Sequence, residues 1–160
     1  MSTKDRISDG KTLTIPEDKK HSFTLLVAEW NTEITHALRD GCIRTLKKHG
    51  VTDKRIDVVS VPGSFELSSA AAYFAAKEEC HAVICLGCVI QGETRHFDFI
   101  CQAVADGLTR AGIQYLKPVI FGVLTTNDQK QAKERAGGKL GNKGCEAAEA
   151  ALQMLQVMSK

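Results

Sequence analysis

Residues 82–98 read AVICLGCVIQGETRHFD, and this stretch contains the strand-to-helix change on which the predicted fold is built. Its first five residues are all apolar, as in a strand that is buried on both faces of a sheet. From Phe97 onward the apolar residues follow helical spacing, with Ile100, Cys101, Val104 and Leu108 on one face. Residues 87–96 are therefore predicted to form a loop between a strand and a helix.

A loop of this kind lies at the carboxyl end of a parallel strand, where open α/β sheets bind ligands. The backbone N–H groups of Gly92, Glu93 and Thr94 are predicted to lie at the helix start, where they could hold an anion. His96 would then stand at the edge of a phosphate-sized site.

The same alternation of strand and helix continues on both sides of this stretch. The other predicted strands are 23–28, 56–61 and 118–124, and the predicted helices are 31–50, 66–77, 97–112, 129–136 and a last one capped by Asn142. Strands that alternate with helices pair in parallel through right-handed crossovers. The predicted fold class is therefore α/β, a three-layer αβα sandwich with a four-stranded parallel sheet in the order 2-1-3-4.

Length and charge restrict the partners. The 160 residues suit one domain over 21–160, preceded by a polar arm over 1–20 in which Leu13 and Ile15 could form a tail or an extra edge strand. A net charge of +2 with both signs interspersed favours neither nucleic acid nor a membrane as a partner. The arm lacks the apolar segment of a secretory signal, so a cytoplasmic location is expected.

The six cysteines are expected to be thiols. Cys85 and Cys88 form a C-x-x-C pair, but no second pair stands at zinc-finger spacing, so neither a metal nor another cofactor is expected. Inert, mostly buried thiols are expected at Cys42, Cys80, Cys85, Cys101 and Cys145. Cys88 is the one expected near a ligand.

Distinctive residues follow each predicted strand: 30–31 the first, 62–66 the second, 87–96 the third and 125–126 the fourth. Since the carboxyl ends of parallel strands share one edge of the sheet, these residues are predicted to meet there. They would form a pocket with an aromatic platform, a carboxylate, an anion-binding loop and one imidazole. Such a pocket suits a planar heterocycle and a phosphorylated partner.

Four sequence blocks carry a resemblance to a known family. They are VPGSFE at 61–66, GCVIQGETRHFD at 87–98, GVLTT at 122–126, and ERAG at 134–137 followed by NKG at 142–144. In this order they resemble the 6,7-dimethyl-8-ribityllumazine synthases, over residues 23–158. The resemblance implies a flavodoxin-like fold and pentamers with shared active sites. It also implies condensation of 5-amino-6-ribitylaminouracil with 3,4-dihydroxy-2-butanone 4-phosphate, with release of phosphate and two waters.

The resemblance also assigns roles to single residues. Trp30 matches the ring-stacking aromatic, although a smaller aromatic is common there, and His96 matches the proton-transfer residue. The substrate-binding positions are Ser64, Phe65, Glu66, Val89, Ile90 and, from a neighbouring subunit, Phe121. The phosphate-binding positions are Gly92, Glu93, Thr94 and Arg135, with Lys139 and Lys143 as nearby basic residues.

Simpler interpretations of these residues stay open. His96 could be a surface residue at a helix start, Trp30 an ordinary core residue, Glu66 a helix-terminal charge and Arg135 half of a surface ion pair. Two other functions also remain: an archaeal-type riboflavin synthase, and a noncatalytic lumazine- or flavin-binding shell protein. Among the assemblies that the family forms, the short turn over 137–142 favours a 60-subunit icosahedral shell over a free pentamer.

Overall fold

The computed structural model describes residues 17–159, and its central feature is one parallel sheet. The strands are β1 (Phe23–Ala28), β2 (Ile56–Val61), β3 (Ala82–Ile90) and β4 (Val119–Thr126), in the order β2-β1-β3-β4. Every neighbouring pair is parallel, which confirms the predicted order 2-1-3-4. The predicted edge strand at Leu13 and Ile15 lies outside the described residues.

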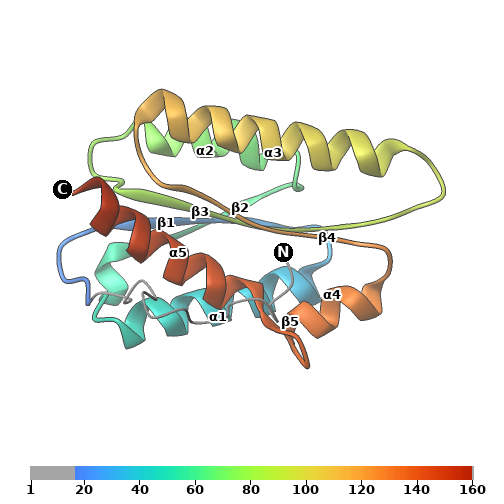
Figure 1. Cartoon of the computed structure of the whole chain (residues 1–160), viewed down its shortest axis with the longest axis horizontal. Helices are drawn as coiled ribbons and strands as arrows, with labels where there is room; N and C mark the ends of the chain where they lie inside the picture. Colours follow the sequence, from blue (N-terminus) through green and yellow to red (C-terminus); the bar gives the residue numbers. More distant parts are fainter. Residues whose placement is uncertain (1–16, 160) are drawn as a thin grey trace, which may run out of the picture.

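Helices cover both faces of the sheet (Figure 1). On one face lie α2 (Leu67–Ala75) and α3 (His96–Tyr115), and on the other lie α1 (Thr32–Lys48), α4 (Gln129–Arg135) and α5 (Lys143–Met158). Successive residues of β1 belong to two separate cores, Leu25 to one and Leu26 to the other. Burial on both faces explains the continuous apolar runs, and the αβα flavodoxin-like prediction is confirmed.

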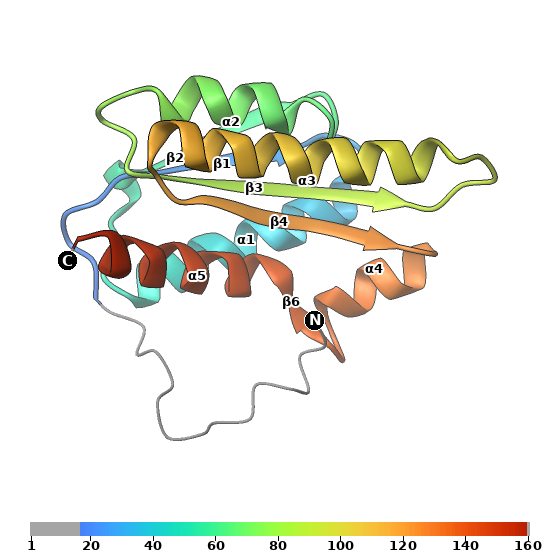
Figure 2. The same ribbon diagram turned by 45° about the horizontal axis from the view of Figure 1, so that its top comes forward.

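The helices leave the two ends of the sheet free for loops. In Figure 2, β3 and β4 point the same way, and the β3–α3 loop and the start of α4 lie beyond their carboxyl ends. Asn142 caps α5: its Oδ1 accepts from the backbone N–H groups of Gly144 at 2.8 Å and Cys145 at 3.3 Å. Its Nδ2 donates to the Ala37 carbonyl of α1 at 3.0 Å, so one side chain joins the start of α5 to α1.

Two segments differ from the prediction. The expected loop at 87–96 is wrong for residues 87–90, because β3 continues and pairs with β4 as far as Ile90 and Thr126. Gly87 is needed inside the strand, since a Cβ there would lie 2.7 Å from the Ser64 hydroxyl that packs over it. The plain turn expected after α4 is instead a small hairpin of β5 (Ala136–Gly138) and β6 (Gly141–Asn142).

All six cysteines are free. Cys42, Cys80, Cys85 and Cys88 are buried, whereas Cys101 and Cys145 are half-buried. Burial raises the pKa of the Cys42 and Cys85 thiols well above their ordinary value, which agrees with the inert thiols predicted there. None of the helices within residues 17–159 has the length and apolarity needed to cross a membrane.

Candidate active site

A cavity of about 840 Å³ opens at the carboxyl end of the sheet. Its walls come from the residues that follow β1 and β2, from the end of β3 and from the start of α3. The lining residues are Trp30, Asn31, Gly63, Ser64, Phe65, Glu66, Cys88, Val89, Ile90, His96 and Ile100. The resemblance assigned substrate-binding or proton-transfer roles to seven of these, and we call this cavity the rim pocket.

Two exposed aromatic rings stand at the rim pocket. Trp30 is 71% exposed and Phe65 is 55% exposed, so Trp30 is not a core residue. Gly63 lies between Trp30 and Glu66: a Cβ there would meet Glu66 Oε2 at 3.1 Å and Trp30 Cδ1 at 3.3 Å. The glycine therefore leaves room for both the indole and the carboxylate beside it. Exposed rings of this kind form a surface on which a planar ligand can stack.

The rim pocket contains one buried polar group without a partner and one side chain that ties two of its elements together. The Ser64 hydroxyl is buried and has no hydrogen-bond partner within residues 17–159. Asn31, at the start of α1, has φ 59° and donates from Nδ2 to the Cys88 carbonyl at 3.0 Å. This bond ties the start of α1 to β3, a positioning role that the sequence did not reveal. Burial raises the pKa of Cys88 to about 11, so it stays a thiol.

His96 is the first residue of α3 and is exposed. Its backbone N–H donates to Thr94 Oγ1 at 3.4 Å, while its ring has no hydrogen bond within the described part of the chain. Because α3 starts at His96, the amides of Gly92, Glu93 and Thr94 belong to the turn that leads into the helix, and their role in anion binding stays a prediction. These three residues are exposed and do not line the rim pocket.

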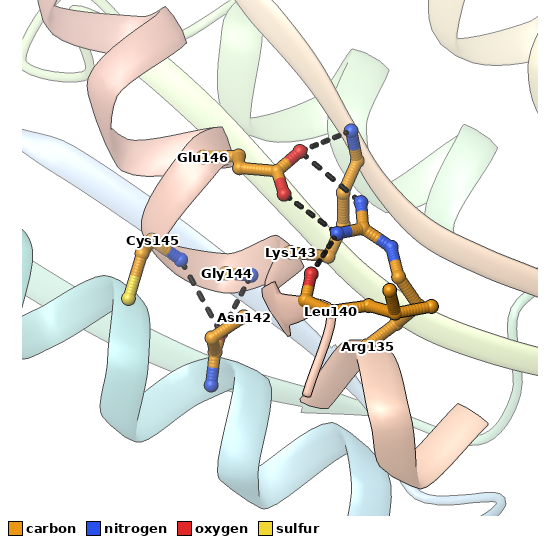
Figure 3. A network of polar contacts seen from close by, with 7 residues as sticks. All are labelled: Arg135, Leu140, Asn142, Lys143, Gly144, Cys145 and Glu146. Carbon is orange, nitrogen blue, oxygen red and sulfur yellow. Dashed lines mark hydrogen bonds and ion pairs between the residues drawn. The ribbon is translucent and has the colours of Figure 1, made fainter. Parts of the chain in front are cut away.

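A second group of charged residues lies at the end of α4 and the start of α5 (Figure 3). Arg135 Nη1 donates to Glu146 Oε1 at 2.8 Å and to the Leu140 carbonyl at 2.6 Å, and Nη2 donates to Glu146 Oε2 at 3.2 Å. Lys143 Nζ lies 3.2 Å from Glu146 Oε2. Burial raises the pKa of Glu146, but bonds from Arg135 and Lys143 outweigh burial and lower it below its ordinary value. We call Arg135, Lys143 and Glu146 the basic cluster.

Glu146 was missed by sequence reasoning. It lies in the first turn of α5, where an acidic residue is common because it offsets the partial positive charge of the helix terminus. Only its contact with Arg135 marks it as part of a site. Arg135 therefore does form an ion pair, but its side chain is only 17% exposed, so the pair is not a surface one, and the role of Arg135 as the phosphate cation stays a prediction.

The rim pocket and the basic cluster are separate within one chain. Arg135, Lys139 and Lys143 do not line the rim pocket, and neither does Phe121. Phe121 lies in β4, an edge strand, where it pairs with Cys85 and is 36% exposed. Lys139 is exposed, and its backbone N–H donates to Glu134 Oε2 at 3.1 Å. Residues 17–159 contain no group of three or more His, Cys, Asp or Glu residues placed to hold a metal ion.

Comparison with known proteins gives one family. The family model described as 6,7-dimethyl-8-ribityllumazine synthase matches residues 20–159. A protein of that name from Cytophaga hutchinsonii is 54% identical over 97% of this chain and 98% of its own length. The corresponding protein from Porphyromonas gingivalis is 51% identical over 92% of each chain, and that from Phocaeicola vulgatus is 44% identical over 96% of this chain and 92% of its own. Neither alternative function, riboflavin synthase or noncatalytic shell protein, is favoured by these relatives.

Proposed function

The chain belongs to the 6,7-dimethyl-8-ribityllumazine synthase family, and we propose that the rim pocket is where its reaction takes place. The protein is a transferase of riboflavin biosynthesis that condenses 5-amino-6-ribitylaminouracil with 3,4-dihydroxy-2-butanone 4-phosphate. The observation that carries the assignment of the site is the meeting of Trp30, Glu66 and His96 in one cavity. An aromatic platform, a carboxylate and an imidazole are the groups that this chemistry needs.

We propose that the pyrimidine stacks on Trp30 and Phe65. The buried Ser64 hydroxyl, which has no partner, then gains one from the ribityl chain, and Glu66 accepts hydrogen bonds from ribityl hydroxyl or ring N–H groups. The backbone at Val89 and Ile90, at the end of β3, meets the pyrimidine edge. These contacts bring the nucleophilic amine close to the second substrate, and such positioning accounts for a large part of many rate enhancements.

His96 is the residue that we propose for proton transfer. Schiff-base formation, phosphate elimination and ring closure each move a proton near neutral pH, where imidazole is the side chain best suited to do so. The exposed ring of His96 has no partner within residues 17–159, so it is free to approach the substrate. The turn at Gly92, Glu93 and Thr94 lies one residue before it, so phosphate held on these amides would lie near the imidazole.

Arg135 is proposed as the phosphate cation, with Lys143 beside it and Lys139 in the adjacent hairpin. A guanidinium and a phosphate can form two parallel hydrogen bonds. Arg135 already makes such a pair with Glu146, so the phosphate must share or replace the carboxylate. We therefore infer that Glu146 holds the guanidinium in place until the substrate arrives.

The active protein is proposed to be a homo-oligomer, because the rim pocket of one chain lacks both the basic cluster and Phe121. A neighbouring copy would supply them across a heterologous interface, which closes into a ring. Exposed apolar residues on α2 and α3 fit such an interface; they include Tyr73, Phe99 and Ile113. We propose a pentamer, assembled further into a 60-subunit shell, and a cytoplasmic location, in agreement with six free thiols.

The activity is tested by mixing the two substrates and following the fluorescence of the lumazine together with phosphate release. Equal amounts of lumazine and phosphate are expected. Lumazine formed without the phosphorylated substrate would contradict the assignment.

The assembly is tested by analytical ultracentrifugation over a range of concentrations and buffers. A 60-subunit species is expected. A single pentameric species would exclude the shell, and a fully active monomer would exclude the shared site as well.

A further inference from the structure

A second polar cavity, of about 440 Å³, lies at the amino end of the sheet, opposite the rim pocket. It is built from the starts of β1 and β2, the end of α2 and the segment before β3. The lining residues are Ser22, Phe23, Thr24, Lys54, Arg55, Ile56, Asp57, Phe74, Lys77, Glu79 and Cys80. None of them belongs to the rim pocket or the basic cluster, and we call this cavity the amino-end pocket.

Arg55 is the first sign that the amino-end pocket takes an anion. Its Nη1 atom is buried and has no hydrogen-bond partner within residues 17–159. A buried charged donor without an acceptor is costly, and such groups are rare in folded proteins. Arg55 is half-buried and lines the cavity, so an acceptor that enters there would lie against the same guanidinium.

Two lysines that make no ion pair within the described residues add positive charge to the cavity. Lys77 Nζ lies 4.7 Å from the ring centroids of both Tyr73 and Phe74, which hold it by cation–π contacts. Lys54 is exposed beside Arg55 and has no ion pair within the described range. Arginine and lysine side chains together are typical of phosphate recognition.

His81, which precedes β3, lies near several positively charged side chains at this end of the molecule. Its pKa lies below the ordinary value, first because of burial and then because of the positive charges of His21 and Lys117, with a smaller contribution from Arg55. Asp18 acts in the opposite direction but does not reverse the shift. Burial is the largest cause of this shift, and His81, His21 and Lys117 do not line the amino-end pocket, so the shift places positive charge near this end of the sheet rather than within the cavity.

Asp57 and Glu79 also line the cavity, and they define the rest of the ligand. A bare anion would be repelled by these carboxylates, whereas hydroxyl groups next to the anion would donate to them. We propose that the amino-end pocket binds a phosphate monoester of a polyol, with its phosphate on Arg55 and Lys54 and its hydroxyls on Asp57 and Glu79.

The test is calorimetric titration of the assembled protein with glycerol 3-phosphate and, separately, with inorganic phosphate. Arg55→Gln should remove one binding site per subunit and leave lumazine formation unchanged. Lys54→Gln should weaken that site by about tenfold, as expected for the loss of one charge-assisted hydrogen bond. The control Arg110→Gln changes an exposed arginine of α3 outside the cavity and should retain all binding.

The catalytic phosphate site is identified in the same experiment by Arg135→Lys, so the two sites are distinguished. Equal binding by wild type, Arg55→Gln and Lys54→Gln would overturn the proposal and leave the catalytic assignment intact. Tighter binding of inorganic phosphate than of glycerol 3-phosphate would also overturn it, because the two carboxylates would then have no ligand hydroxyl to accept. A crystal soaked with tungstate should show anomalous density at Arg55, and density at Arg135 alone would again reject the site.

Discussion

The ring of His96 has no hydrogen-bond partner within residues 17–159, whereas the guanidinium of Arg135 has acceptors at Leu140 and at both oxygens of Glu146. The same contrast extends to their surroundings. Trp30 and Phe65, beside His96, are more than half exposed, while Arg135 and Glu146 have side chains that are 17% and 23% exposed.

This contrast shows two ways of preparing a site. The rim pocket leaves the Ser64 hydroxyl and the His96 ring without partners within the described residues, so a substrate only has to add contacts to them. The basic cluster satisfies its groups internally, which holds them in position but requires the ligand to exchange one partner for another. Mutations in the rim pocket should therefore lower the reaction rate or the affinity for the stacked ring. Mutations in the basic cluster should instead lower the affinity for phosphate and the free energy of unfolding.

Replacement of His96 tests whether the group without partners performs the chemistry. His96→Asn keeps a polar side chain at the start of α3 but removes the titrating group. We expect kcat to fall about 100-fold while both KM values stay within about threefold, because substrate binding does not depend on proton transfer. Single-turnover kinetics of lumazine formation measures this effect. An unchanged kcat would remove His96 from the reaction.

Replacement of Arg135 tests whether its guanidinium exchanges Glu146 for the substrate phosphate in the basic cluster. Arg135→Lys keeps the charge but loses the planar fork that binds phosphate through two bonds. We expect the KM for the butanone phosphate to rise about 30-fold while the KM for ribitylaminouracil stays nearly unchanged. Steady-state kinetics with each substrate varied separately measures it, with Arg110→Lys as the control. An unaltered KM for the phosphate substrate would exclude Arg135 from the site.

The sequence was sufficient for the sheet order and for most of the rim pocket. Continuous apolar runs such as 82–86 identify strands that are buried on both faces, and the residues that follow parallel strands meet at one edge. Trp30, Ser64 and His96 could therefore be placed together before the structure was known. These residues lie together because of the strand order of the sheet, which the local pattern of apolar runs predicts well.

Contacts between distant segments could not be predicted in the same way. Glu146 resembles any acidic residue at a helix start until Arg135, from another helix, is seen against it. Asn31 resembles an ordinary helix cap, but its side chain donates to Cys88 instead. Gly87 suggested the end of β3, whereas the strand needs glycine there because Ser64 packs above it. The resemblance located Arg135, but its partner came only from the structure.

Trp30 tests the stacking surface of the rim pocket. It is the only tryptophan of the chain, so its emission should fall when a lumazine analogue stacks on it. Trp30→Phe should keep most of the affinity, whereas Trp30→Ala should weaken binding about tenfold through loss of the ring contact. Fluorescence titration, corrected for inner-filter absorption, measures the first effect and calorimetry the second. Emission that stays constant at saturation would place Trp30 outside the site.

The last prediction concerns the stability that the internal pairing of the basic cluster contributes. Glu146 has a folded-state pKa below the ordinary value of 4.5, because bonds from Arg135 and Lys143 outweigh the effect of burial. For a carboxylate with a lowered pKa, the stabilisation is fully present above the unfolded-state pKa and is lost as the pH falls through the folded-state pKa. Glu146→Gln cannot titrate, so the variant should lack this contribution at every pH.

We therefore expect the free energy of unfolding of wild type to exceed that of Glu146→Gln by about 1 kcal/mol near neutral pH. This corresponds to roughly 3 °C in apparent Tm. The difference should shrink as the pH falls below 4.5, since protonation of Glu146 removes the charge that the variant already lacks. Thermal scans measure this difference in Tm. The protein concentration is kept equal, because the Tm of an oligomer depends on concentration. Glu78→Gln, at an exposed acid without an ion pair in the described range, should show no such pH dependence. If the difference in Tm between wild type and Glu146→Gln were the same at pH 7 and pH 3, Glu146 would stabilise the basic cluster by its packing rather than by its charge. The contrast between the basic cluster and the rim pocket would then be a difference in packing alone.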